Sequence, residues 1–233
     1  AVDMISGRAG VQHKLEQAPT PTSITYKELH ERAEQLSAAL TARLGALRGK
    51  AEPPVLATKM KRGIDWYCIF CAAARLQVPL VALSVDLPDK TAEERRNAEI
   101  LAEHKLGLLV VDDSCASSSS ILGNNAGGVP ICSFAQLAEE AQEASLVCQL
   151  LPGATPAATL CFSYTGGTTK ASRCVRITHE MALHEVAAYP QVTSLSRSDR
   201  VFQQHSVYWA ASAYGEIDIA LAFGCALVFC EAW

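Results

Sequence analysis

The chain reads Phe162-Ser163-Tyr164-Thr165-Gly166-Gly167-Thr168-Thr169-Lys170 at the end of an apolar run that begins at Ala157. A phosphate group is bound by several hydrogen-bond donors that converge on it at close range. Adjacent glycines let the backbone approach the anion, threonine hydroxyls add donors, and the cations Lys170 and Arg173 neutralise charge. The stretch therefore indicates a phosphate-binding loop after a buried strand, with a nucleotide as the ligand.

This short motif also has ordinary explanations. Two glycines between strands are compatible with a plain turn, so the loop by itself leaves phosphate binding and a turn open. Further along, Thr178 suits a helix N-cap as well as a catalytic role, and His179 suits a structural place in the first turn. The surrounding sequence has to decide between these interpretations.

Outward from the loop, apolar strand-length segments alternate with helical patterns. Thr25 and Glu28 have the spacing of a capping box, and Asp65 and Ser133 are placed to cap two later helices. We expect helices at 26 to about 49, 65–76, 88–104, 133 to about 146, after 178, and 211–223. We expect strands at 55–60, 78–83, 106–111, 129–132, 157–162, 174–177, 201–203 and 225–230.

This alternation predicts an α/β fold, with a largely parallel β-sheet flanked by helices on both faces. Ligands of such sheets bind beyond the carboxyl ends of the strands, which is where the glycine loop falls. Residues 1–22 are predicted to be an irregular lead-in, and the Ser-, Asn- and Gly-rich residues at about 112–128 a flexible loop.

Composition excludes several classes of protein. The chain has 233 residues, of which 49% are hydrophobic and 19% charged, and its net charge is −4. That charge argues against a nucleic-acid partner or a polybasic membrane role. No apolar run approaches the about 20 residues of a transmembrane helix, so we expect no transmembrane segment. The first residues lack the pattern of a secretory signal, which leaves a cytoplasmic location as the default.

Nine cysteines lie mostly inside apolar runs, where they are expected to act as small buried side chains with reduced thiols. Cys68 and Cys71 have CxxC spacing, but no second pair follows and the segment reads as a buried helix. Core packing is therefore favoured over redox or metal chemistry, and we predict no metal ligands among these side chains.

One known phosphate loop reads roughly Tyr-Thr-Ser-Gly-Thr-Thr-Gly-x-Pro-Lys-Gly-Val, followed a few residues later by Thr-His. This chain matches it at Tyr164-Thr165, Gly167-Thr168-Thr169, Val175 and Thr178-His179. The loop therefore resembles that of the adenylate-forming superfamily, which includes acyl-CoA synthetases, luciferases and the adenylation domains of nonribosomal peptide synthetases. Two earlier segments, 24–29 and 79–88, also resemble segments of that superfamily.

The resemblance implies that residues 23–233 are a partial N-terminal adenylation (AMP-binding) domain. The family's adenine and ribose elements, Tyr-Gly-x-Thr-Glu and Arg-Thr-Gly-Asp, are not found in the sequence. The family's C-terminal domain, which bears its catalytic lysine, is expected to be absent from these residues. This piece alone is therefore not expected to turn over.

The resemblance also implies an activity. The family joins a carboxylic acid to ATP, which gives an acyl-adenylate and pyrophosphate, and then passes the acyl group to a thiol of coenzyme A or of a carrier protein. By this resemblance Thr165, Gly166, Gly167, Thr168 and Thr169 would hold the β- and γ-phosphates. Lys170 and Arg173 would be the catalytic cations, with Mg²⁺ bridging the phosphates. A larger multi-domain assembly is a further expected partner.

Departures from the family pattern leave two other classes open. Gly166 replaces a serine, Lys170 and Cys174 replace glycines, Ser172 replaces a proline, and Arg173 replaces a lysine. These changes also suit a catalytically silent module that serves as an interaction or scaffold domain. An unrelated nucleotide hydrolase is disfavoured because Gly-x-x-x-x-Gly-Lys-Ser/Thr is absent.

The acyl pocket is predicted by counting back from Gly224. Peptide-synthetase adenylation domains carry an aspartate that pairs with the substrate's amino group, and this position falls on Ala211. A buried ammonium without a carboxylate partner is costly, so a plain carboxylic acid is the expected substrate. His205 or Trp209 would flank the pocket, although a histidine of this kind is more often a satisfied, partly buried side chain and such a tryptophan is more often part of the core.

Overall fold

The computed structural model describes residues 22–45, 53–112, 128–143, 155–165 and 172–230. The predicted lead-in, except Thr22, lies outside these residues. So do most of the predicted loop at 112–128 and the centre of the glycine loop at 166–171.

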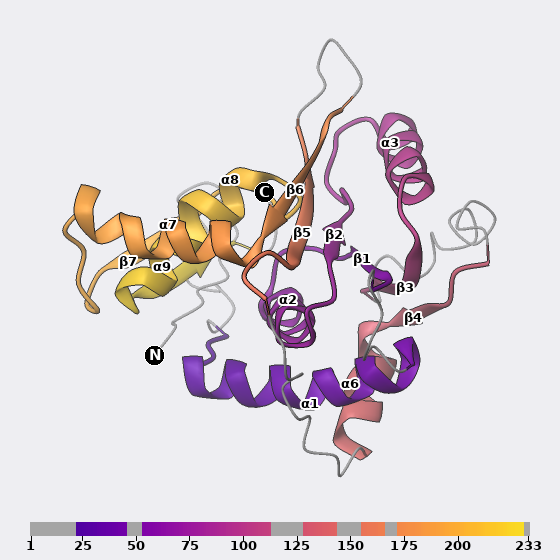
Figure 1. Ribbon diagram of the computed structural model, residues 1–233, viewed down its shortest axis with the longest axis horizontal. Coiled ribbons are helices and arrows are strands. Elements are labelled where there is room, and N and C mark those ends of the chain that lie inside the picture. The colour runs from indigo at the N-terminus through magenta and orange to yellow at the C-terminus, as the bar shows by residue number, and fades with distance from the viewer. Residues whose placement is uncertain (1–21, 46–52, 113–127, 144–154, 166–171, 231–233) are drawn as a thin grey trace, which may run out of the picture.

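The main sheet has six strands in the order β4-β3-β1-β2-β5-β6 (Figure 1). Neighbouring strands are parallel except β5 and β6, which form an antiparallel pair. The strands are β1 (Val55–Lys59), β2 (Leu80–Ala82), β3 (Leu106–Val111), β4 (Ile131–Ser133), β5 (Thr159–Tyr164) and β6 (Cys174–Thr178). The predicted largely parallel sheet is confirmed.

Helices cover both faces of this sheet, because successive side chains along each buried strand point to opposite faces. Leu56 and Leu80 pack on the face covered by α1 (Tyr26–Leu44), α2 (Ile64–Leu76) and α6 (Phe134–Glu143). Their neighbours Ala57 and Val81 pack on the other face, against α3 (Lys90–Ala102). Figure 1 shows α3 across the sheet from α1, α2 and α6.

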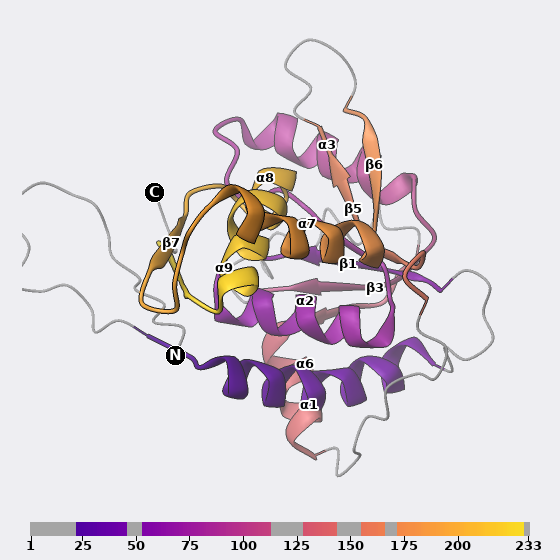
Figure 2. The same cartoon turned by 60° about the vertical axis from the view of Figure 1, so that its left-hand side comes forward.

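The last part of the chain forms a second, smaller unit (Figure 2). Its strands β7 (Arg200–Gln203) and β8 (Ala226–Phe229) pair in parallel as a separate two-stranded sheet. Its helical segments are α7 (His179–Val192), α8 (Ala210–Ser212), a π-helical turn (Ala213–Ile217) and α9 (Asp218–Phe223). Both strands were predicted, but their separation from the main sheet was not.

Polar contacts attach this unit to the larger one. The hydroxyl of Tyr26 donates to the backbone oxygen of Cys225 at 2.8 Å, and that of Tyr67 donates to the side-chain oxygen of Gln203. Arg62 is 6% exposed and donates to the backbone oxygens of Gln204 and Cys230, each at 2.7 Å. The position of β7 and β8 therefore depends on side chains far away in the sequence.

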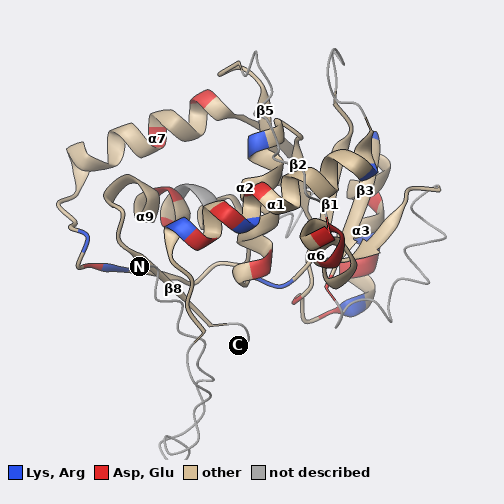
Figure 3. Cartoon of the chain, turned by 90° about the horizontal axis from the view of Figure 1, so that it is seen from below, with Lys and Arg blue, Asp and Glu red and all other residues tan. Residues whose placement is uncertain are grey.

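The solvent side of α1 carries charges of both signs (Figure 3). Lys27 and Glu31 form an exposed pair at 3.7 Å, and Glu34 pairs with Arg75 of α2 at 3.3 Å. Interspersed signs of this kind do not form a basic stripe along the helix. No helix within the described ranges is long and apolar enough to cross a membrane.

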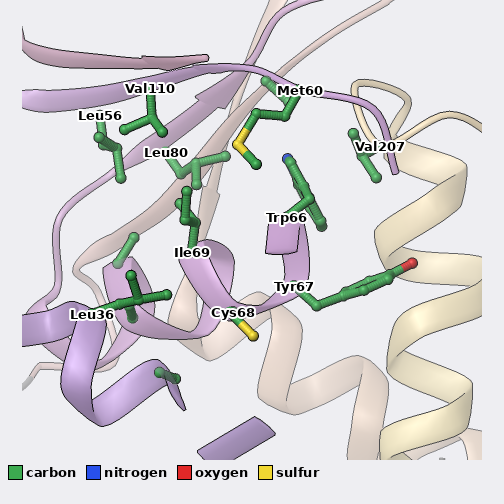
Figure 4. Close-up of a cluster of buried hydrophobic side chains, with 14 of the residues drawn as sticks. Leu36, Leu56, Met60, Trp66, Tyr67, Cys68, Ile69, Leu80, Val110 and Val207 are labelled. Atoms are coloured by element: carbon green, nitrogen blue, oxygen red, sulfur yellow. The ribbon is translucent and has the colours of Figure 1, made fainter. Parts of the chain in front are cut away.

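The core on the α1–α2 face is shown in Figure 4. Ile69 of α2 points toward Leu56 and Leu80 of the sheet, while Leu36 of α1 lies on its other side. The CxxC pair belongs to this region, as predicted. Burial raises the pKa of Cys68 to about 12 and that of Cys71 to about 11, so both remain protonated thiols in the packed helix.

Some helix ends differ from the sequence prediction. The capping box of α1 is confirmed, since Glu28 accepts from the backbone N–H of Thr25 at 2.7 Å. The helix ends at Leu44 rather than near residue 49, because Gly45 has a φ of 71° and closes it. Asp65 does not cap α2, which begins at Ile64 after Gly63; its carboxylate lies in the first turn, where the helix dipole favours it.

Candidate functional site

The candidate phosphate loop connects two paired strands, β5 and β6. The backbone N–H of Thr165 donates to the backbone oxygen of Arg173 at 3.0 Å, and the N–H of Arg173 donates to Thr165 Oγ1 at 3.0 Å. These two bonds close the hairpin at its base. Because β5 is parallel to β2, this base lies at the carboxyl edge of the parallel strands.

Of the seven residues predicted to bind phosphate, the structure describes two. Thr165 and Arg173 face each other across the hairpin and are exposed to solvent. Gly166, Gly167, Thr168, Thr169 and Lys170 lie outside the described residues, and their roles stay predictions.

A cavity of about 360 Å³ opens beside this hairpin. Its walls come from β5, β6, α7 and the start of α8, and its lining residues are Ser163, Tyr164, Thr165, Val175, Ile177, Met181, Glu185, Trp209, Ala210 and Ala211. Concave, mostly apolar spaces of this volume are typical of small-molecule sites. The structure thus brings Trp209 and Ala211 to the same space as Thr165.

His205 does not line this cavity. Its Nδ1 lies 2.8 Å from Glu216 Oε1, and its ring is half exposed. The same carboxylate accepts the backbone N–H of Gln204 at 3.0 Å. His205 therefore has a partner in its own unit, which favours the structural interpretation of this histidine.

Glu185 is a cavity residue that sequence reasoning missed. It lies one helical turn after Met181 on α7, so both side chains share the face that lines the cavity. Ala211 supplies no carboxylate, but Glu185 brings one into the same space from α7. A glutamate on a surface helix gives no signal of this in sequence, since such residues are usually solvated.

The wall that carries Trp209 is fixed to the carboxyl edge of the sheet. The hydroxyl of Tyr208 donates to Asp86 Oδ1 at 2.9 Å, and the hydroxyl of Ser206 donates to Asp86 Oδ2. Burial and the carboxylate of Asp86 raise the pKa of Tyr208 to about 12, so its hydroxyl stays a donor. The guanidinium of Arg96 lies 5.3 Å from the centre of the Tyr208 ring.

The described residues do not form a magnesium site by themselves. Mg²⁺ prefers oxygen ligands in octahedral geometry. Where three described side chains of the metal-binding types lie together, they are Glu103, His104 and Cys174, and a thiol with an imidazole does not suit magnesium. Use of Mg²⁺ therefore stays a prediction.

The AMP-binding enzyme family matches residues 9–233. The chain belongs to the AMP-binding enzyme family. No curated protein sequence matches it significantly.

Several solved structures are similar to this AMP-binding chain. MatB from Rhodopseudomonas palustris with ATP bound aligns at a TM-score of 0.74 and 15% identity, over 91% of this chain and 41% of MatB. The N-terminal subdomain of Klebsiella oxytoca NpsA in complex with 3-hydroxyanthranilyl-AMSN aligns at 0.72 and 23%, over 92% and 49%. VinN with 3-methylaspartate aligns at 0.72 and 21%, over 88% and 54%.

At these identities the similarity shows the fold alone. The chain spans between 41% and 54% of the length of these three structures. The predicted α/β fold is thereby confirmed, and the family match over residues 9–233 confirms the resemblance stated from the sequence. Thr178 is confirmed as the N-cap of α7 in this fold, because its Oγ1 accepts the N–H of Met181 at 3.2 Å.

The carboxyl group of Asp218, in the first turn of α9, is buried and should make the stability depend on pH. It is 7% exposed, and its Oδ2 has no partner among the described residues. Burial, and then the nearby Glu185, raise its pKa to about 7. Because the folded pKa lies above the unfolded value of about 4, stability is full at low pH and falls as pH rises toward 7.

We expect Asp218→Asn to raise the free energy of unfolding at pH 8 by roughly 1–2 kcal/mol, less than the whole shift because of residual hydration. At pH 4 the variant should equal the parent. Urea unfolding across pH 4–8 measures both. Asp89→Asn is the matched control, since Asp89 is exposed and asparagine caps α3 as well. An unchanged pH slope in Asp218→Asn would contradict the assignment.

Proposed function

We propose that this chain supplies the phosphate-binding part of an enzyme that activates a carboxylic acid with ATP. The product is an acyl-adenylate, pyrophosphate is released, and the acyl group then passes to a thiol of coenzyme A or a carrier protein. The observation that supports the proposal most is the position of Thr165. This residue lies at the base of the loop and also lines the cavity. A triphosphate on the loop and an acid in the cavity would meet there.

The chemistry suits such a place. A carboxylate oxygen of the acid attacks the α-phosphorus of ATP, and the bond from that phosphorus to the β-phosphate oxygen breaks. Negative charge grows on the leaving pyrophosphate, so oriented donors and cations help more than an acid–base pair does. We assign the donors to Thr165, Gly166, Gly167, Thr168 and Thr169. The cations are Lys170 and Arg173.

Similar proteins support this function in outline. MatB was solved with ATP, and VinN with 3-methylaspartate, which is a carboxylic acid. We propose that residues 23–233 form part of an N-terminal AMP-binding domain whose other parts supply the adenine and ribose contacts. Within these residues the cavity would hold the acyl part of the substrate beside Trp209 and Ala211.

Exchange of labelled pyrophosphate into ATP tests the proposal in the full protein that carries this chain. We expect exchange only when a carboxylic acid from a substrate panel is present. ATP binding without any exchange would favour the silent interaction module, to which the altered loop residues also point. Phosphate release that needs no acid would favour a nucleotide hydrolase.

Glu185 bears on which carboxylic acid the cavity accepts. The expectation of a plain carboxylic acid rested on Ala211, yet Glu185 can pair with an ammonium group that enters from the α7 side of the cavity. We therefore expect acids with an amino group to exchange better than matched acids without it. Glu185→Gln should reduce that preference by about tenfold, because it removes one charged hydrogen bond.

The control for this comparison is Glu180→Gln, on the same helix but exposed and away from the cavity lining. Its preference should equal that of the parent. If Glu185→Gln leaves the ratio between the two kinds of acid unchanged, Glu185 does not contact the substrate.

A further inference from the structure

Ser163 of β5 carries a buried hydroxyl group in the wall of the cavity. The residue is 9% exposed, and its Oγ has no hydrogen bond to any other residue that the structure describes. Buried polar groups in native proteins nearly always have a partner. A lone hydroxyl that lines a cavity therefore indicates a partner from outside the chain, either water or a ligand.

The strand turns this hydroxyl toward the cavity. Cys161 packs on the sheet face covered by α1 and α2, whereas Phe162 and Tyr164 pack on the face covered by α3. Because side chains alternate along a strand, Ser163 lies on the same face as Cys161. Its cross-strand neighbour Val175 lines the cavity with it. The hydroxyl of Ser163 is thus directed away from α3.

A second, smaller space adjoins the cavity and is bordered by β5 and α2. Its volume is about 20 Å³, which is room for one water molecule and too little for an acyl group. The two spaces share four lining residues, Ser163, Ile177, Trp209 and Ala210. A substrate group that reaches the hydroxyl of Ser163 must therefore come from the larger cavity.

Two other polar side chains beside the smaller space have partners within the chain. Trp66 Nε1 donates to Thr58 Oγ1 at 3.3 Å, and the hydroxyl of Tyr208 donates to Asp86 Oδ1 at 2.9 Å. The hydroxyl of Ser163 stays available to whatever occupies the cavity. A ligand group that forms this hydrogen bond can replace a water molecule there, whereas an apolar group leaves the hydroxyl unpaired and loses affinity.

We propose that Ser163 selects carboxylic acids that carry a hydroxyl group at the end remote from the carboxylate. The inference rests on the proposed function, in which the acid lies in this cavity with its carboxylate beside Thr165. Ser163 precedes Thr165 by two residues, so its side chain lies about 7 Å away along the strand, on the same face. A hydroxyl group several bonds from the carboxylate would meet it there. Sites that bind a substrate hydroxyl discriminate strongly against the analogue without it.

Calorimetric titration of the purified full protein with single acids, without ATP, measures this selectivity. Butanoate, pentanoate and benzoate are each compared with their monohydroxy analogues. In the parent, at least one hydroxy acid should bind about tenfold more tightly than its unsubstituted counterpart, because its hydroxyl group keeps Ser163 paired. Ser163→Ala should bring that ratio to about one, since no buried hydroxyl is then left unpaired. Ser163→Cys keeps a similar shape but offers only a weak donor, so it should lower the ratio as well.

Ser194→Ala is the matched control, since Ser194 is exposed after α7 and lines neither space; it should keep the ratio of the parent. Melting temperatures verify that each variant is folded. Equal binding within every pair of acids, no binding of any acid, or an unchanged preference in Ser163→Ala would overturn the inference. Pyrophosphate exchange tests the proposed function separately. A preference for hydroxy acids without exchange would refute the reaction and leave the selectivity of Ser163 standing.

Discussion

The double variant Thr168→Ala/Thr169→Ala is expected to weaken ATP binding by about a hundredfold or more, because each hydroxyl would lose a hydrogen bond to a charged phosphate worth about 1.5–3 kcal/mol. The hairpin base explains why these residues are the ones to change. Hydrogen bonds between Thr165 and Arg173 close β5 and β6 at the base of this segment, and we propose that the residues between them bind the phosphates. Isothermal titration calorimetry with ATP measures the affinity.

The control is Thr22→Ala/Thr41→Ala, which makes the same substitution at two exposed threonines, one before α1 and one within it. It should bind ATP like the parent. Melting temperatures of both variants should match the parent, so that a loss of ATP binding reflects the loop and not unfolding. If the loop variant binds ATP with unchanged affinity, the segment is a plain turn and the phosphate assignment fails.

Local patterns in the sequence predicted the elements of the main sheet well. The strand at 106–111 has the predicted bounds because it is a continuous apolar run buried on both faces. The start of α1 was predictable because Thr25 and Glu28 lie three residues apart in the sequence. The side chain of each accepts a hydrogen bond from the backbone N–H of the other, so the cap needs no distant contact. The end of α1 was not, since the helical spacing of leucines continues past Gly45.

Features that depend on distant contacts could not be predicted. The apolar pattern at 225–230 identifies a strand but not its partner, and its separate sheet depends on bonds such as that from Tyr26 to Cys225, 199 residues apart. In the site, Glu185 reaches the cavity only because α7 packs beside the hairpin. Glu103 and His104 meet Cys174 only once α3 and β6 are in place. No short-range spacing carries that information.

Arg62→Met is expected to lower the free energy of unfolding by about 3–5 kcal/mol, because it leaves buried carbonyl groups without their charged donor. Arg62 follows β1 and reaches into the second unit, where it donates to Gln204 and Cys230 at 2.7 Å and to His205 at 3.3 Å. Methionine fills a similar volume, so the loss reflects hydrogen bonds rather than a cavity. Urea unfolding measures it.

The hydrogen bonds of Arg62 also affect the cavity. They hold the backbone at 203–205, which leads directly to the cavity residue Trp209. Arg62→Lys keeps the charge but only one compact donor group, and should fall between the parent and Arg62→Met. Arg95→Met, on the exposed side of α3, should change stability by less than about 0.5 kcal/mol. If Arg62→Met is no less stable than Arg95→Met, the guanidinium neither holds the second unit to the sheet nor positions the Trp209 wall.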